Sequence, residues 1–301
     1  MQFLVPDGNS DGMNHRALIA LATAGVLWGL TVPLSKVALG WMDPAWLTVA
    51  RFGLAAPILT YIGRRHLRAA LTPSVAAWGA LGYGMVIVLQ NLGIERTSVS
   101  HAALVYGAVP ALVAVVALLA RRSESGPLAW AGFAVALTGV ALVAGGGGSA
   151  SLAGDALVLA SAVLSALFIF AQADTLRGRD PVAVTAVQML AAALVALPIA
   201  LIAGKPPTLR PEQAELWCAV ALCSAGSLLP YALYAFGQAR VQAEFAGAFL
   251  NLEPLVGAAA GALAFGDAFG ALQLAGATAI LLGLGMSLGR MRGRVPAIAR
   301  A

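Results

Sequence analysis

The sequence predicts an all-α integral membrane protein in which ten transmembrane helices form two inverted five-helix repeats. Composition, a regular series of apolar segments and internal similarity between the two halves lead to this prediction. Of the 301 residues, 60% are hydrophobic and 10% are charged, whereas soluble chains have about 45–50% and about 25%. Such a chain cannot cover a globular surface with polar groups. A soluble enzyme, a disordered protein and a nucleic-acid-binding protein are therefore disfavoured.

Each predicted helix is an apolar segment of about 20 residues, the length that crosses a hydrocarbon core of about 30 Å. Charged or turn-forming breaks separate the segments, and several breaks are short, so consecutive helices are expected to be antiparallel neighbours. The ten segments are 17–39, 44–63, 74–94, 98–120, 127–145, 155–173, 181–203, 214–236, 242–265 and 269–289.

The positions of Lys and Arg predict the orientation of these helices. Alternate sides of the membrane carry 13 and three basic residues, and Lys36 and Arg51 fall within helices. The basic side contains Arg16, Arg64, Arg65, Arg68, Arg121, Arg122, Arg177, Arg179, Arg240, Arg290, Arg292, Arg294 and Arg300, and the other side contains Arg96, Lys205 and Arg210. The positive-inside rule then predicts that the tails at 1–16 and 291–301 are both cytoplasmic. The expected location of the protein is the bacterial inner membrane.

The two halves of the chain are similar in sequence. Asp43-Pro44 aligns with Asp180-Pro181 at an offset of 137, and Gly93-Ile-Glu-Arg96 aligns with Gly237-Gln-Ala-Arg240 at an offset of 144. The second offset also pairs Pro110 with Pro254, Gly132 with Gly276 and Gly139 with Gly283. The predicted repeats are 17–145 and 155–290. Because each has an odd number of helices, the second enters the membrane from the opposite side, a recurrent design of secondary transporters.

Short motifs follow one another in a characteristic order, namely Trp28-Gly29, Lys36, Arg51-Phe52, Pro110, Pro254 and Gly266-Asp267. In this order, over about residues 17–290, the chain resembles the EamA-type members of the drug/metabolite transporter superfamily. The second copy departs from the pattern, with Ser165-Ala166 for Trp-Gly and Gln188-Met189 for Arg-Phe, and Asp267 stands where the family usually has Glu.

The resemblance implies export or exchange of small metabolites. It also implies a central cavity lined mainly by helices 1, 3, 4, 6, 8 and 9. Amino-acid exporters of the YddG type are similar in size and helix count.

Polar residues at mid-membrane depth are candidate functional residues, because lipid penalises an unpaired charge. Glu253 lies about 11 residues into its segment, about 16 Å along the helix, and Pro254 follows it. Asn251 and Glu253 are candidates for substrate or proton contact, with a purely structural buried Glu as the alternative. Pro110 and Pro254 are expected to act as matched hinges or gates, since Pro kinks or opens a helix.

Two basic residues inside the spans are interpreted differently. Lys36 is a candidate charge at the outer mouth that guides a carboxylate. Arg51 is only seven residues from Pro44, so a structural role is favoured, in which its side chain snorkels to the interface or pairs with Asp43.

Aromatic residues near the midplane predict an apolar cavity wall with a few hydroxyl groups, suited to hydrophobic or aromatic amino acids. The predicted wall residues are Trp28, Tyr83, Tyr106, Phe168 and Tyr231. The motifs Gly25-x-x-x-Gly29, Gly257-x-x-x-Gly261 and Gly285-x-x-x-Gly289 predict close helix packing.

The leading hypothesis is a secondary transporter or facilitator that exports small metabolites, most of all amino acids, by alternating access. The alternative is export of drugs or other metabolites driven by proton exchange through Glu253. A channel would need a continuous polar stripe, and a membrane enzyme would need a reactive cluster. No catalytic residue, cofactor or metal is expected. The expected partners are a small-molecule substrate and the lipid bilayer, without nucleic acid, and a monomer is favoured.

Overall fold

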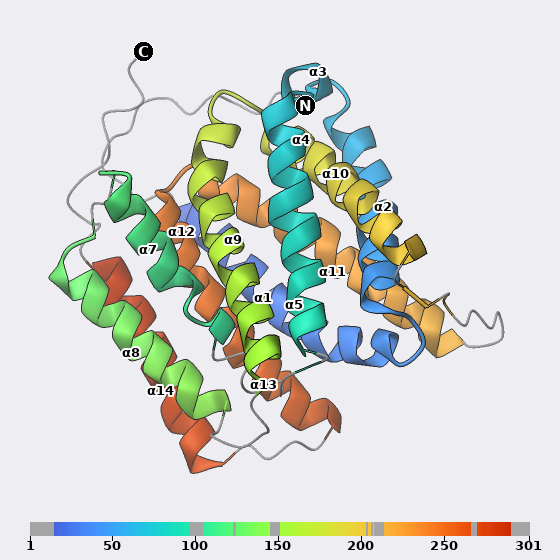
Figure 1. Ribbon diagram of the computed structural model, residues 1–301. Helices are drawn as coiled ribbons and strands as arrows, with labels where there is room; N and C mark the ends of the chain where they lie inside the picture. Colours follow the sequence, from blue (N-terminus) through green and yellow to red (C-terminus); the bar gives the residue numbers. More distant parts are fainter. Residues whose placement is uncertain are drawn as a thin grey trace.

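Helices form all the regular secondary structure in the part of the chain that the structure describes. The structure is a computed structural model that describes residues 15–94, 96, 105–122, 125–144, 151–202, 204–205, 207, 214–265 and 270–289. Figure 1 shows the helices packed side by side in a bundle. Within these described residues, five helices are long and apolar enough to cross a membrane, and three further apolar helices are shorter. The chain is therefore an all-helical membrane protein, as predicted.

The helices coincide closely with the apolar segments. The first half contains α1 (His15–Leu39), α2 (Pro44–Gly63), α3 (Leu67–Ala70), α4 (Pro73–Gly79), the π-helix η1 (Ala80–Met85), α5 (Val86–Ile94), α7 (Val109–Leu119) and α8 (Pro127–Ala144). The second half contains α9 (Leu152–Leu176), α10 (Pro181–Ile202), α11 (Ala214–Gln238), α12 (Ala243–Ala248), the 3-10 helix η2 (Phe249–Asn251), α13 (Leu252–Phe265) and α14 (Ala271–Gly289). Residues 98–104 of the predicted span 98–120 lie outside the described residues, so the count of ten helices stays a prediction.

The repeated Asp-Pro motif begins the second helix of each half. Asp43 Oδ1 accepts a hydrogen bond from the backbone N–H of Ala45 at 3.0 Å. Asp180 Oδ1 accepts one from Ala183 at 2.9 Å. Each carboxylate therefore satisfies a backbone donor at the start of its helix, and the following Pro, which lacks an N–H, fits the first helical position. The two Asp residues are N-caps, and Asp43 is not the partner of Arg51.

Matched glycines bring α8 and α14 into direct backbone contact. A Cβ placed on Gly132 would lie 2.6 Å from the carbonyl oxygen of Gly283, and one on Gly139 would lie 2.6 Å from that of Gly276. The earlier glycine of α8 contacts the later glycine of α14, and the later one contacts the earlier one, so the two helices run antiparallel. The sequence repeat pairs Gly132 with Gly276, yet each glycine contacts the counterpart of the other, as two copies related by a two-fold axis must.

Glycines on α1 allow the same close approach to α13. A Cβ on Gly29 would lie 2.8 Å from the carbonyl oxygen of Glu253 and 2.9 Å from the backbone nitrogen of Gly257. This contact and the 2.7 Å approach of a Cβ on Gly25 to the carbonyl oxygen of Phe249 confirm the packing role expected of the first glycine motif, Gly25-x-x-x-Gly29. The third expectation is wrong for Gly285, because nothing lies within 4 Å of a Cβ placed there; α14 uses Gly283 instead.

Two helical segments and one turn inside the bundle depart from regular α-helical geometry. The π-helix η1 joins α4 to α5 and contains Tyr83, and the 3-10 turn η2 joins α12 to α13 and contains Asn251. Pro254 lies in the first turn of α13, while Pro110 occupies one of the first two positions of α7, after a turn at Gly107 and Ala108. Each Pro therefore restarts a helix after a break. The hinge role of both residues stays a prediction.

Candidate functional site

Aromatic side chains from four elements meet in the interior of the bundle. The ring of Tyr231 on α11 lies 4.4 Å from that of Tyr83 on η1 and 5.0 Å from that of Trp28 on α1, both edge-on. The ring of Phe168 on α9 lies 4.9 Å from that of Tyr83. The structure thus brings together four of the five aromatic residues predicted from mid-membrane depth. Edge-to-face contacts of this kind are favourable for aromatic rings.

Three further aromatic residues extend this cluster, and the sequence interpretation missed them. One is Trp78 on α4, whose ring lies 6.4 Å from that of Phe168. Phe52 on α2 contacts Tyr83 and Tyr231, with ring centroids 6.1 and 5.6 Å apart. Tyr234 on α11 lies 5.1 Å from Trp28. Phe52 belongs to the Arg-Phe motif, and Tyr234 follows Tyr231 at the spacing of one helical turn. That spacing could have identified Tyr234.

Tyr106, the fifth predicted aromatic residue, connects the first half to the second. Its hydroxyl donates a hydrogen bond to Ser165 Oγ at 3.3 Å, and it interacts electrostatically with both Glu253 and Tyr231. Ser165 is the repeat counterpart of Trp28. A small hydroxyl-bearing residue therefore replaces a large ring at the matched position, so the two halves contribute different chemistry to the interior.

Asn251 and Glu253 lie at the break between α12 and α13. Asn251 is 2% exposed, and its Oδ1 atom has no hydrogen-bond partner among the described residues. Glu253 lies inside the bundle but retains accessible surface, and it makes no ion pair or hydrogen bond within the described part of the chain. The Asn251 Oδ1 atom and the Glu253 carboxylate therefore make no hydrogen bond to the described residues.

Arg51 is the main correction to the sequence interpretation. Its side chain is 7% exposed, so it neither snorkels to the interface nor pairs with Asp43. The Nε–H donates to Ser227 Oγ on α11 at 2.6 Å, and the guanidinium lies 5.6 Å from the centroid of the Phe52 ring. It also interacts electrostatically with Glu253. Since α2 packs between α10 and α11, Arg51 faces protein rather than lipid.

The equivalent position in the second half is neutral and fully paired. Gln188 on α10, the counterpart of Arg51, exchanges two hydrogen bonds with Gln172 on α9, at 2.9 and 2.7 Å. Both side chains are at most 1% exposed. At this position, the second half of the molecule therefore has a buried amide that is hydrogen-bonded to another amide, whereas the first half has a buried cation.

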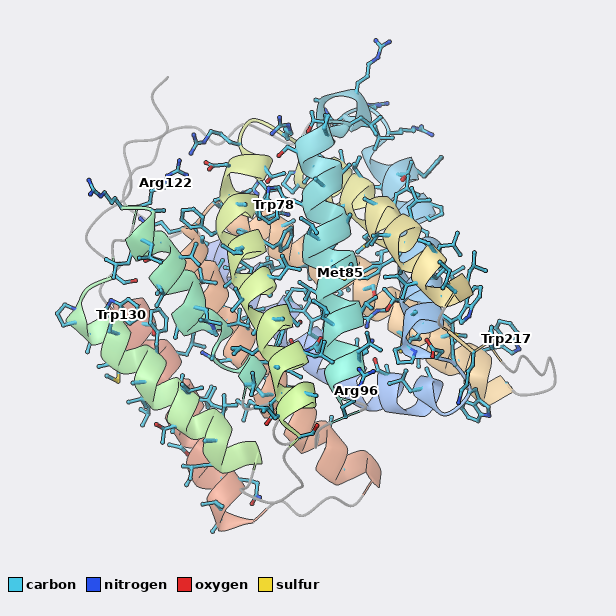
Figure 2. All side chains as sticks on the ribbon, in the orientation of Figure 1. Trp78, Met85, Arg96, Arg122, Trp130 and Trp217 are labelled. Atoms are coloured by element: carbon cyan, nitrogen blue, oxygen red, sulfur yellow. The ribbon has the colours of Figure 1, made fainter. Side chains whose placement is uncertain are left out.

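The remaining candidate, Lys36, belongs to α1, but its side chain lies outside the described part of the structure. No group of three or more His, Cys, Asp or Glu residues that could hold a metal ion occurs among the described residues. The charged ends of the bundle are visible in Figure 2, where Arg122 lies toward one end and Arg96 toward the other. The alternation of basic residues between the two sides predicts this separation.

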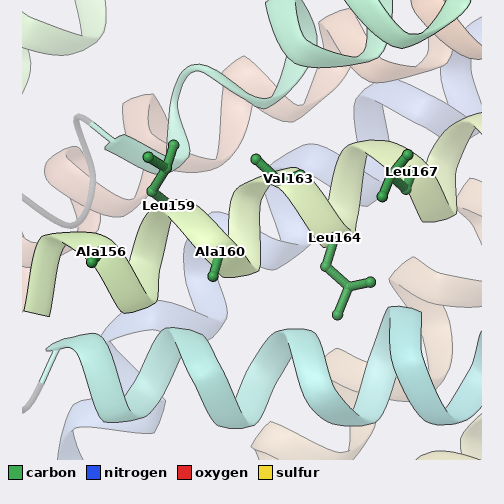
Figure 3. A pocket seen from close by; sticks show the side chains of 6 residues that line it. All are labelled: Ala156, Leu159, Ala160, Val163, Leu164 and Leu167. Atoms are coloured by element: carbon green, nitrogen blue, oxygen red, sulfur yellow. The ribbon is translucent and has the colours of Figure 1, made fainter. Parts of the chain in front are cut away.

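A separate hollow of about 490 Å³ lies along α9 and is lined by Ala156, Leu159, Ala160, Val163, Leu164 and Leu167. Figure 3 shows that all six side chains come from this one helix. Leu159 is 49% exposed and carries no polar group. The hollow is an apolar surface of the kind that faces lipid, and it is distinct from the aromatic interior.

Comparisons with known proteins agree with this architecture. Residues 15–145 and 152–289 each match the EamA-like transporter family. A transporter of Bacillus subtilis (strain 168), YyaM, is 25% identical over 288 residues, which cover 91% of this chain and 94% of that protein. A probable terminal-alkyne amino-acid exporter of Streptantibioticus cattleyicolor is 27% identical over 271 residues, which cover 88% of this chain and 80% of that protein.

A protein of known crystal structure has the same fold. It superposes with a TM-score of 0.79 at 18% sequence identity, covering 92% of this chain and 97% of the other. Two copies of one unit, a helical bundle and a polar aromatic interior define a multi-pass membrane transporter. The chain belongs to the EamA-like transporter family.

Proposed function

We propose that this transporter exports small metabolites across the bacterial plasma membrane, with hydrophobic and aromatic amino acids as the favoured cargo. It works by alternating access: ten helices form two inverted units, 17–145 and 155–290, and both termini are cytoplasmic. A central cavity between the units opens to one side at a time. No nucleotide or metal takes part. One chain is the functional unit.

The aromatic cluster beside Glu253 is the observation that carries this proposal. Trp28, Tyr83 and Tyr231 supply an apolar surface with hydroxyl groups, while Glu253 supplies an accessible charge next to them. A pocket that combines aromatic walls with a few polar groups suits an amphiphilic small molecule. The relative named as an amino-acid exporter supports the choice of cargo.

The breaks at η1 and η2 support the mechanism. Non-helical backbone at membrane depth is tolerated where it lines a cavity or is buried in protein, and π-helical turns are frequent at functional sites. Both breaks contribute a predicted site residue, Tyr83 and Asn251. Pro110 and Pro254 lie at the restarted helices, where a change of helix direction would open or close the cavity.

Counterflow in proteoliposomes tests the proposed function. Vesicles that contain the purified protein are loaded with unlabelled L-phenylalanine and diluted into a trace of the labelled amino acid. We expect transient accumulation of label without ATP, and none in vesicles without protein. Lack of counterflow with L-phenylalanine and with a panel of other amino acids, drugs and nucleotide sugars would refute a transport function.

Proton exchange through Glu253 is a second candidate, for cargo that includes drugs and other metabolites. The carboxylate favours it because it is accessible and lacks an ion pair among the described residues, although Arg51, Tyr106 and Tyr231 interact with it electrostatically. A proton gradient directed out of the vesicles should then accelerate uptake by the wild-type protein, and Glu253→Gln should abolish this acceleration. An unchanged gradient response in Glu253→Gln excludes this role.

A further inference from the structure

The interior contains a buried guanidinium and a partly buried carboxylate that interact but do not form an ion pair. Arg51 and Glu253 influence each other electrostatically, yet their charged atoms are not within the 4.0 Å of a salt bridge. They come from opposite halves of the chain, α2 and α13. Two opposite charges in a low-dielectric interior are held apart at a cost unless something lies between them.

Arg51 retains unused hydrogen-bond donors. Its Nε–H donates to Ser227, but its two terminal amino groups make no hydrogen bond to the described residues. They are also absent from the set of fully enclosed unpaired atoms, so they reach accessible space. The edge of the guanidinium that carries these two amino groups is thus available to a carboxylate.

Tyr231 lies near enough to both charged side chains to interact with each of them. Its hydroxyl interacts electrostatically with both Arg51 and Glu253, and its ring belongs to the aromatic cluster. Phe52, which neighbours Arg51, contacts the same ring. The two charges and the aromatic wall therefore surround a shared region. In the same region, Trp28 Nε1 and Tyr234 Oη are buried polar atoms without a hydrogen-bond partner among the described residues.

We infer that Arg51 and Glu253 form a clamp for a zwitterion, in which Arg51 binds the carboxylate of a free amino acid and Glu253 binds its ammonium group. This inference rests on the proposed function and narrows the cargo to α-amino acids whose side chains pack against the aromatic cluster. The clamp neutralises both charges of the cargo at once. It also compensates the charges of Arg51 and Glu253. A zwitterion should therefore bind more tightly than a ligand that carries only one of the two charges.

Three compounds that share a phenyl ring test the clamp: L-phenylalanine, phenethylamine, which lacks the carboxylate, and 3-phenylpropionate, which lacks the amine. Their binding to the purified full-length protein is measured by calorimetry and by the shift of the thermal midpoint. We expect the wild-type protein to bind L-phenylalanine at least about tenfold more tightly than either analogue. Arg51→Gln should remove the preference over phenethylamine, and Glu253→Gln the preference over 3-phenylpropionate.

Ser227→Ala is the matched control, because it removes the hydrogen bond of Arg51 but leaves the guanidinium in place. If Arg51 only ties α2 to α11, Ser227→Ala and Arg51→Gln should weaken L-phenylalanine binding equally, and the clamp is overturned. If the clamp is correct, Ser227→Ala keeps the preference. Arg51→Lys covers the case in which Arg51→Gln does not fold: it should retain a preference over phenethylamine, and losing that preference in a folded variant contradicts the clamp.

Two outcomes separate the clamp from the proposed function. The clamp would be overturned, while transport stands, by a protein that shows counterflow of another metabolite but binds neither the three phenyl compounds nor any other amino acid. The expected binding pattern in a protein that shows no counterflow would overturn transport alone. Equal binding of L-phenylalanine and phenethylamine by the wild-type protein is evidence against the clamp in either case.

Discussion

At the scale of single residues, the most informative position is the one occupied by Arg51 in one half and Gln188 in the other. Burial is similar at the two sites, but their partners differ. Gln188 is satisfied by Gln172 through two hydrogen bonds, whereas Arg51 bonds through Nε alone. Protein interiors satisfy their polar groups almost completely. The paired amides of Gln188 and Gln172 fit a structural role, and the unused donors of Arg51 fit the binding role that the proposed clamp assigns to it.

The reciprocal amide pair should behave as a structural unit. Gln188→Met leaves the buried Gln172 amide without a partner, so we expect a loss of about 1–3 kcal/mol of stability, seen as a lower thermal midpoint. Replacing both residues with Met or Leu should restore most of that loss, since no polar group is then stranded. A double variant that is less stable than the single variant by the same amount again would show that the pair is not coupled. Neither change should alter ligand preference.

At the scale of elements, the sequence predicted where helices begin but not how they depart from regular geometry. The Asp-Pro motif has a local cause, a capping carboxylate before a residue suited to the first helical turn, and it was recognisable. The π-helix containing Tyr83 has no such local signal. In the same way, depth along a helix could not distinguish lipid from protein as the neighbour of Arg51, because both surroundings favour an apolar sequence. Only the packing of α2 between α10 and α11 decides it.

Two glycines on α14 provide a direct test of helix packing. A Cβ on Gly283 would lie 2.5 Å from the carbonyl oxygen of Gly132 and 2.6 Å from the backbone nitrogen of Ala136, whereas one on Gly285 meets nothing within 4 Å. Gly283→Ala should therefore cost about 1–3 kcal/mol through overpacking. Gly285→Ala should be neutral or slightly stabilising, because Ala favours the helix more than Gly does. Thermal unfolding in detergent compares the two; equal midpoints would argue against close α8–α14 contact.

At the scale of the whole molecule, the distribution of basic residues predicts which end faces the cytoplasm. Figure 2 shows Arg122 and Arg96 toward opposite ends of the bundle. Arg122 pairs with the half-exposed Asp174 at 2.7 Å, and an exposed pair contributes about 0–1 kcal/mol, so its replacement should be tolerated. The apolar segments, the basic loops and the repeat were all readable from sequence. The electrostatic interaction of Arg51 with Glu253 was not, since it depends on the packing of helices from both halves.

Thiol labelling of whole cells tests this orientation. Arg96→Cys should react with a membrane-impermeant maleimide added outside, and Arg122→Cys should react only after the cells are opened. Both variants are made in a Cys218→Ser background, because Cys218 is exposed and Cys223 is buried. The reverse labelling pattern would contradict the predicted topology.

The reciprocal contact of Gly132 with Gly283 and of Gly139 with Gly276 is the way in which two identical subunits meet in a two-fold dimer. In a true homodimer every residue near the axis would appear twice, so a buried guanidinium would be accompanied by a second one facing it. Joining the copies in one chain removes that constraint. One copy could keep Arg51 while the other acquired Gln188, and only one copy carries Glu253 where the other has Val109. Fusion of the halves therefore allows the proposed binding site to be single and to have different charges at its two ends, although the two halves are similar.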